Sequence, residues 1–246
     1  MSLVKFVFAT DTHGDMVNAS AVEKLLTFVD SWKPKYRIHG GDGMDLRCYR
    51  KGASREERED GISRDVQAHL HFLNQYKPHV FIEGNHDDRL REQSEYGSEE
   101  ARSTEIAREL QDTLDAYYRK KKMQVVKYSY VNGRKDYWQA PEGGYYFAHG
   151  KHHNMHAAKS NHETYEHPVI CGHVHRFCSW QGRTGTSYTS PCLADIEKLR
   201  YDRHRPGKYK QSNGWVYGMI NSKTGNSIAW TVVCDGGKWL SPEGEL

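Results

Sequence analysis

Residues 78–87 read Pro-His-Val-Phe-Ile-Glu-Gly-Asn-His-Asp. The apolar run in this stretch is typical of a short buried strand, and it ends in a glycine followed by three polar residues. Two earlier stretches have the same layout: residues 3–9 run into Asp-Thr-His at 11–13, and residues 36–39 run into Gly-Gly-Asp-Gly at 40–43. Each stretch predicts a buried strand whose carboxyl end is followed by side chains capable of chemistry.

The segments between these strands have the spacing of amphipathic helices. Between residues 17 and 29 an apolar residue recurs at every fourth position, and similar runs begin at Ile62 and Ile106. Because strands and helices alternate up to residue 120, we expect an α/β arrangement with at least partly parallel strands.

The chain after residue 120 changes character. Short β-like runs separated by Gly or Asn take over at 123–128, 145–148, 169–171, 176–180, 215–220 and 228–233, and only 152–162 has a helical pattern. No repeat, linker or low-complexity tract divides the sequence. One sandwich of helix-covered sheets therefore fits better than two domains.

The composition excludes several classes of protein. Lys and Arg number 35 against 32 Asp and Glu, and this balance argues against a surface that is basic all round, although a local basic patch is compatible with it. The mean hydropathy is −0.88, and no apolar run approaches the roughly 18 residues of a membrane span. The first nine residues lack the layout of a signal peptide, and the five scattered cysteines favour reduced thiols. We expect a cytoplasmic protein that does not enter a membrane.

Histidine is unusually frequent, with 15 residues, and it is the commonest metal ligand. Ligand sites of open α/β sheets lie just outside the carboxyl ends of strands, where this sequence places both carboxylates and imidazoles. Such donors suit Mn²⁺, Fe, Zn²⁺ or Co²⁺ better than they suit Ca²⁺ or a thiolate zinc site. Seven candidates are too many for one tetrahedral ion and fit two ions that share a carboxylate. The candidates are Asp11, His13, Asp42, Asn85, His149, His173 and His175.

Five motifs in this order resemble those of the calcineurin-like metallophosphoesterase superfamily. They are D-x-H at 11–13, G-D-x-x-D at 41–45, G-N-H-D at 84–87, H-G at 149–150 and G-H-x-H at 172–175. The resemblance implies an α/β fold, a β-sandwich of mixed sheets flanked by helices in four layers (α/β/β/α), formed as one domain by residues 1–246. The short single-domain members found in bacteria and phages are the most similar kind.

The resemblance also divides the ligands between two divalent transition-metal ions, Mn²⁺ or else Fe, Zn²⁺, Co²⁺ or Ni²⁺. The first ion would be held by Asp11, His13 and His175, and the second by Asn85, His149 and His173, with Asp42 bridging them. A hydroxide between the ions would attack phosphorus while both ions draw charge from the phosphate oxygens.

His86 stands beside a ligand, yet the resemblance implies that it protonates the leaving oxygen and binds no metal. Asp87, its neighbour in sequence, or Asp45 would orient it, and Asp87 joins His86 as a catalytic candidate. The alternative is structural, with His86 acting only as a cap for the helix that follows.

Residues 198–210 read KLRYDRHRPGKYK, with six Lys or Arg against one Asp. Basic groups neutralise phosphates and tyrosines stack on bases, so this segment suits a nucleic-acid substrate, although a solvated loop is the alternative. A further arginine stands three residues after His86, where a surface ion pair is the alternative. The candidate substrate contacts are Arg89, Arg200, Arg203 and Arg205.

These observations favour a metal-dependent phosphoesterase acting on a phosphodiester of nucleotide or nucleic-acid type. The motifs do not separate diesters from monoesters, so a phosphomonoesterase for nucleotides or phosphoproteins is an alternative. A non-catalytic scaffold of the same fold is another. The sequence makes no prediction of the oligomeric state.

Overall fold

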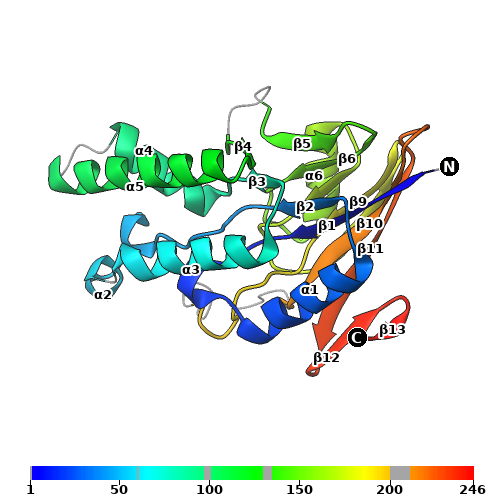
Figure 1. Ribbon diagram of the computed structural model, residues 1–246, viewed down its shortest axis with the longest axis horizontal. Helices are drawn as coiled ribbons and strands as arrows, with labels where there is room; N and C mark the ends of the chain where they lie inside the picture. Colours follow the sequence, from blue (N-terminus) through cyan, green and yellow to red (C-terminus); the bar gives the residue numbers. More distant parts are fainter. Residues whose placement is uncertain (1, 60, 97–100, 130–134, 200–210) are drawn as a thin grey trace.

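The computed structural model describes residues 2–59, 61–96, 101–129, 135–199 and 211–246. Two β-sheets pack face to face, and helices cover their outer sides (Figure 1). This arrangement confirms the predicted sandwich of mixed sheets flanked by helices.

The larger sheet has eight strands in the order β13-β12-β11-β10-β1-β2-β3-β4. Its parallel half comprises β1 (Leu3–Ala9), β2 (Tyr36–His39), β3 (Val80–Ile82) and β4 (Gln124–Val126). Its antiparallel half comprises β10 (Gly214–Asn221), β11 (Ser227–Asp235), β12 (Lys238–Ser241) and β13 (Gly244–Glu245). The last strands of the chain therefore return to pair beside the first.

The smaller sheet has five strands in the order β5-β6-β7-β9-β8. They are β5 (Tyr137–Ala140), β6 (Gly143–Ala148), β7 (Val169–Cys171), β8 (Cys178–Gly182) and β9 (Gly185–Thr189). The three inner strands are parallel and the two edge strands are antiparallel to their neighbours.

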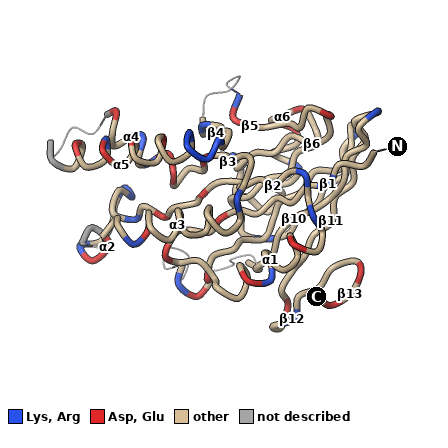
Figure 2. Tube along the Cα trace, viewed as in Figure 1, with Lys and Arg blue, Asp and Glu red and all other residues tan. Residues whose placement is uncertain are grey.

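The helices fall into three groups. α1 (Ala19–Trp32) and α3 (Ile62–Tyr76) lie against the outer face of the larger sheet, and α6 (Ala157–Tyr165) packs on β7, β8 and β9 of the smaller one. α4 (Asn85–Tyr96) and α5 (Ala101–Lys120) pack on each other, while α2 (Arg55–Glu59) is a single short helix. Figure 2 shows basic and acidic residues interspersed along α4 and α5. No helix among the described residues is both long and apolar enough to cross a membrane.

Strand β1 is buried on both faces, which explains its almost continuous apolar sequence. Val7 and Ala9 belong to the core under α1 and α3, whereas Phe6 and Phe8 belong to the core between the sheets. The rings of both phenylalanines contact Phe147 of β6, with centroid distances of 5.0 and 6.0 Å. Because successive side chains of a strand point to opposite faces, β1 contributes to the core under the helices and also to the core between the sheets.

Some elements differ from the sequence-based expectations. The run at 123–128 is β4 of the larger sheet and continues the parallel half, although its position in the chain suggested the β-rich second half. The helix expected at 152–162 begins later, at Ala157, because Asn154 turns the chain by accepting a hydrogen bond from the backbone of His156. Helix α4 has no strong apolar pattern, so the sequence indicates a helix after His86 without giving its extent.

Candidate metal centre

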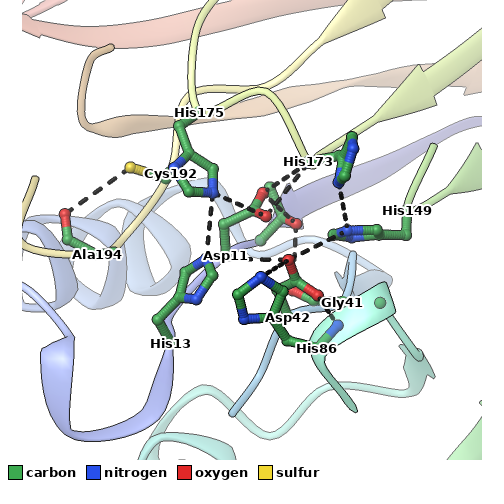
Figure 3. A network of polar contacts seen from close by, with 12 residues as sticks. Asp11, His13, Gly41, Asp42, His86, His149, His173, His175, Cys192 and Ala194 are labelled. Atoms are coloured by element: carbon green, nitrogen blue, oxygen red, sulfur yellow. Dashed lines mark hydrogen bonds and ion pairs between the residues drawn. The ribbon is translucent and has the colours of Figure 1, made fainter. Parts of the chain in front are cut away.

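The carboxyl ends of five strands meet at one edge of the sandwich. β1, β2 and β3 of the larger sheet and β6 and β7 of the smaller one each end within four residues of a predicted ligand. Figure 3 shows six of the predicted ligands pointing toward one another. The seventh, Asn85, begins α4 and places its side-chain oxygen 3.1 Å from Nε2 of His149. The structure therefore brings all seven predicted ligands together.

One group of ligands comes from the loops after β1 and β7. Nε2 of His13 lies 3.1 Å from Nε2 of His175, which in turn lies 3.4 Å from Oδ1 of Asp11. These three side chains form one of the clusters whose donor atoms could hold an ion. They are the set predicted for the first ion.

The other group surrounds His149 at the end of β6. Its Nε2 lies 3.2 Å from Nδ1 of His173, 3.1 Å from the side-chain oxygen of Asn85 and 3.3 Å from Oδ2 of Asp42. The same carboxylate oxygen is 3.9 Å from Nε2 of His13 in the first group. Asp42 thus lies between the two groups, as a bridging carboxylate must.

The donor atoms are spaced as ligands of a common ion. An ion with ligands at about 2.1 Å sets neighbouring ligand atoms about 3.0 to 3.4 Å apart in octahedral or tetrahedral geometry. The distances within each group, 3.1 to 3.4 Å, fall in this range. Asp11, His13 and His149 are at most 1% exposed, so this polar cluster is buried. The residues present fit two ions.

The ligand loops adopt backbone conformations that L-residues rarely use. A positive φ costs a non-glycine residue of the order of 1 kcal/mol, and such strain concentrates at functional sites. Five of the seven ligands have one: Asp11 (56°), His13 (50°), Asp42 (48°), His173 (72°) and His175 (56°).

Hydrogen bonds between the ligand loops stabilise some of these backbone conformations. The N–H of Asp11 donates to the carbonyl of Gly41 (2.9 Å), and the N–H of His13 donates to the carbonyl of Asp42 (3.0 Å). The carboxylate of Asp11 also accepts from the N–H of His173, at 3.0 Å. These bonds fix the three loops relative to one another before any ion is considered.

The carboxylates create a strongly negative environment. Burial alone would lower the pKa of His149, but the charges of Asp42 and Asp11 outweigh it and raise the pKa to about 9. Burial likewise opposes the charged form of His13, yet a hydrogen bond to Asp45 and the neighbouring carboxylates raise its pKa to about 9. A site that favours two protonated imidazoles favours positive charge in general, and a divalent ion would take the place of these protons.

His86 lies at the edge of this centre, on the first turn of α4. Its Nδ1 is 3.0 Å from Oδ1 of Asp45, and its Nε2 is 3.9 Å from Oδ2 of Asp42. Its backbone N–H donates to Oδ1 of Asp42, at 2.9 Å. Burial lowers the pKa of His86, and the charges of His13 and Arg89 act in the same direction. Of the two acids considered for orienting His86, Asp45 is the one in contact with its ring.

Asp87, predicted as a catalytic partner, occupies a different place. Its carboxylate accepts hydrogen bonds from the backbone N–H groups of Gly84 (2.8 Å), Met44 (3.0 Å) and Gly43 (3.2 Å). Successive residues of a helix point in different directions, so Asp87 does not share the face of His86. It joins the start of α4 to the loop that holds Asp42.

The predicted substrate contacts fall in two places. Arg89 lies beside His86, with Nη1 3.1 Å from its Nδ1, and donates a hydrogen bond to the carbonyl of Asp45 (2.8 Å). Arg200, Arg203 and Arg205 lie outside the residues that the structure describes.

His39 is a site residue that no motif marked. It ends β2, is fully buried, and its Nδ1 accepts a hydrogen bond from the N–H of Gly41 at 3.1 Å. Burial lowers its pKa to about 3, so the ring is neutral and can accept at this nitrogen. Its Nε2 lies 3.3 Å from the hydroxyl of Thr12, which donates to the carbonyl of Gly43. His39 therefore stabilises the loop that carries Asp42.

The sequence model of the calcineurin-like phosphoesterase family matches residues 4–177. The chain belongs to this family. The match covers all seven ligands of the candidate centre, and it confirms the resemblance carried by the five motifs.

Several solved structures are similar to this chain at low sequence identity. Vps29 from Entamoeba histolytica, solved with Zn²⁺, aligns with a TM-score of 0.50 and 8% identity over 97% of each chain. An archaeal phosphodiesterase aligns with a TM-score of 0.43 and 11% identity, covering 94% of this chain and all of its own. A dimetal phosphatase from Danio rerio has a TM-score of 0.39 and 10% identity, covering 98% of this chain and 96% of its own. The comparison with curated proteins gives no match.

Proposed function

We propose that this calcineurin-like phosphoesterase is a two-metal hydrolase of phosphodiesters of nucleotide or nucleic-acid type. The proposal rests on one observation above all, the two groups of ligands on either side of the Asp42 carboxylate. We further propose that residues 1–246 act as one domain and that the protein works in the cytoplasm, where its five cysteines would stay reduced.

In this proposal the first group of ligands holds one ion, and Asn85, His149 and His173 hold the other. The oxygen and imidazole donors suit Mn²⁺, with Fe, Zn²⁺, Co²⁺ and Ni²⁺ as other occupants. When bound, two such ions supply a nucleophile from water near neutral pH and neutralise charge on the phosphate oxygens. Asp42 keeps the two positions at a fixed separation because one oxygen faces both groups.

The role proposed for His86 is to give a proton to the leaving oxygen. Asp45 lies against Nδ1, so the Nδ1 proton is donated to this carboxylate and the ring is held in one orientation. The proton given to the leaving oxygen would be the second one of the imidazolium form, carried on Nε2. The other ring nitrogen, Nε2, lies on the side of Asp42 and the metal ligands. Asp45 therefore takes the orienting role, and the bonds of Asp87 support a structural role.

Two exposed apolar side chains near the candidate ligands in sequence support a substrate with an aromatic group. Phe177, two residues after His175, is 45% exposed, and Met155 is 52% exposed. Their loops are joined, since Arg176 donates a hydrogen bond to the carbonyl of Asn154, at 2.7 Å. An exposed phenylalanine two residues from a proposed metal ligand is suited to stack on a nucleobase.

The test compares two esters with the same leaving group. Mn²⁺-loaded protein is expected to hydrolyse bis-p-nitrophenyl phosphate faster than p-nitrophenyl phosphate, and then to cleave single-stranded DNA or RNA. Preference for the monoester would overturn the diester proposal. Hydrolysis of neither ester with two ions bound would favour the scaffold alternative.

Two variants separate metal binding from proton transfer. His86→Ala is expected to keep both ions and to lose about 100-fold or more in turnover, the usual contribution of a general acid. Asp42→Ala is expected to lose both ions, as measured by elemental analysis. The exposed His71 of α3 offers a matched control, and His71→Ala is expected to behave as the wild type. Unchanged turnover in His86→Ala would rule out the general-acid role.

A further inference from the structure

Three of the histidines in the centre point Nε2 toward the other ligands. The Nδ1 of each lies against a hydrogen-bonding partner outside the set of ligands. Nδ1 of His13 lies 3.0 Å from the carboxylate of Asp45, and Nδ1 of His149 lies 2.9 Å from the carbonyl of Gly40. A metal-bound imidazole carries its proton on the nitrogen away from the ion, and an acceptor for that proton orients the ring. Both contacts provide such an acceptor.

The third of these histidines is His175, and the partner of its Nδ1 is a side chain distant in sequence. Its Nε2 faces His13 and Asp11, while its Nδ1 lies 3.2 Å from the amide nitrogen Nε2 of Gln211, the donor end of that side chain. His175 is only 3% exposed, so solvent has little access to its ring.

We propose that Gln211 is a positioning residue for the first metal ion, because its amide oxygen accepts the Nδ1 proton of metal-bound His175. The inference rests on the proposed two-metal function. An amide carries a donor and an acceptor at nearly the same place, and a half-turn of its plane exchanges them. Gln211 can therefore donate to the bare nitrogen of metal-free His175 and accept from the protonated one.

Backbone hydrogen bonds hold the residue that follows Gln211 in place. The N–H of Ser212 donates to the carbonyl of His175 (2.9 Å), so residues 211 and 212 contact the same histidine through side chain and backbone. The N–H of Cys192 donates to the carbonyl of Ser212 (3.0 Å), and the N–H of Leu193 donates to the carbonyl of Thr10, at 3.1 Å. This chain of bonds joins Gln211 to the loop of Asp11.

The proposed effect is confined to one of the two ions. His175 belongs to the group with Asp11 and His13, whereas the second group has its own support at Gly40. Loss of the acceptor is expected to weaken only the first ion, by about 10- to 100-fold, as is usual for partners of metal-binding histidines.

The experiment measures metal binding directly. Metal-free protein is titrated with Co²⁺, whose visible absorption reports its ligands, for the wild type, Gln211→Met and Gln211→Glu. Methionine keeps the length of the side chain without a strong acceptor, while glutamate can only accept. Gln67→Met, at an exposed position of α3, is the matched control. Thermal unfolding of each metal-free variant reports on the fold.

The wild type and Gln67→Met are expected to bind two Co²⁺ per chain. Gln211→Met should bind one Co²⁺ as the wild type does and the other about 10- to 100-fold more weakly, while Gln211→Glu restores the affinity. Wild-type affinity for both ions in Gln211→Met would overturn the inference. Equal weakening of both ions with a lowered unfolding temperature would also overturn it, since that pattern indicates a general structural role.

The readout does not depend on turnover. A wild-type protein that binds two Co²⁺ and hydrolyses no ester would refute the proposed function, while the Gln211 variants would still decide this inference.

Discussion

Gly84 lies where β3 gives way to α4, against the loop of Asp42. A Cβ atom at Gly84 would lie 2.1 Å from Oδ1 of Asp42 and 2.4 Å from its backbone nitrogen. Since ordinary van der Waals contact begins at 3.4 Å and the Cβ would stand at 2.1 Å, the Asp42 carboxylate has to move by about 1.3 Å in Gly84→Ala.

This displacement affects both proposed roles of the Asp42 carboxylate. Its Oδ1 accepts the backbone N–H of His86, and its Oδ2 faces the ligands of both ions. A misplacement of about 1 Å near the chemistry costs about 100-fold in rate. We expect Gly84→Ala to lose about 100-fold in turnover and to retain less metal than the wild type.

The assay is hydrolysis of bis-p-nitrophenyl phosphate at saturating Mn²⁺, with metal content measured on the same samples. Gly61→Ala is the matched control, because a Cβ at Gly61 meets no atom within 4 Å and its φ is −68°. Circular dichroism checks that both variants are folded. If folded Gly84→Ala kept turnover within about threefold of the wild type, less than 1 kcal/mol in activation free energy, the steric reasoning would be refuted.

Three further predictions concern residues around the centre. Asp87→Ala leaves three buried backbone N–H groups without their acceptor, so the free energy of unfolding in urea should fall by about 3 kcal/mol or more; unchanged stability with lost turnover would restore the catalytic role. Phe177→Ala should raise KM for a dinucleotide about tenfold at similar kcat, with Phe177→Tyr as the conservative control, and an equal effect on an abasic analogue would contradict base stacking. Asp65 of α3 accepts hydrogen bonds from the backbone N–H groups of Asp45 (3.1 Å) and Leu46 (2.6 Å). Burial raises the pKa of Asp65 to about 6 from 3.8, so between these pH values its folded form holds a proton that its unfolded form has lost. Its contribution to stability is present below pH 3.8 and is lost as pH rises through 6, so the unfolding free energy of metal-free wild type should fall relative to Asp65→Asn by about 2 to 3 kcal/mol between these values. A constant difference between the two proteins would contradict this.

The site was easier to predict from the sequence than the pairing of the strands. The ligands follow short apolar runs, and the carboxyl ends of strands in such sheets converge on one edge, so local patterns were enough to bring all seven together. The pairing of β10 with β1 joins residues more than 200 positions apart, and no local pattern encodes it. The extent of helix α4 could not be predicted because Leu90 is its one fully apolar buried side chain among the described positions.

The supporting residues show a second limit of local patterns. Asp87 adjoins His86 in sequence, yet Asp45 contacts the ring, because neighbouring positions on a helix point apart. His39 and Gln211 lie outside the five motifs, and each contacts the ligand loops only through the tertiary structure. Sequence motifs located the atoms proposed to bind the ions and offered Asp45 as one of two partners for His86. The three-dimensional structure selects Asp45 and adds His39 and Gln211, which no motif marked.

The central claim is that two ions together form the catalytic site. It is tested most directly by titrating metal-free protein with Mn²⁺, at a protein concentration well above the dissociation constants, while following hydrolysis of bis-p-nitrophenyl phosphate. The account predicts no turnover without metal and a rise to a plateau at two Mn²⁺ per chain. A plateau at one Mn²⁺ per chain, or no hydrolysis with both ions bound, would contradict it.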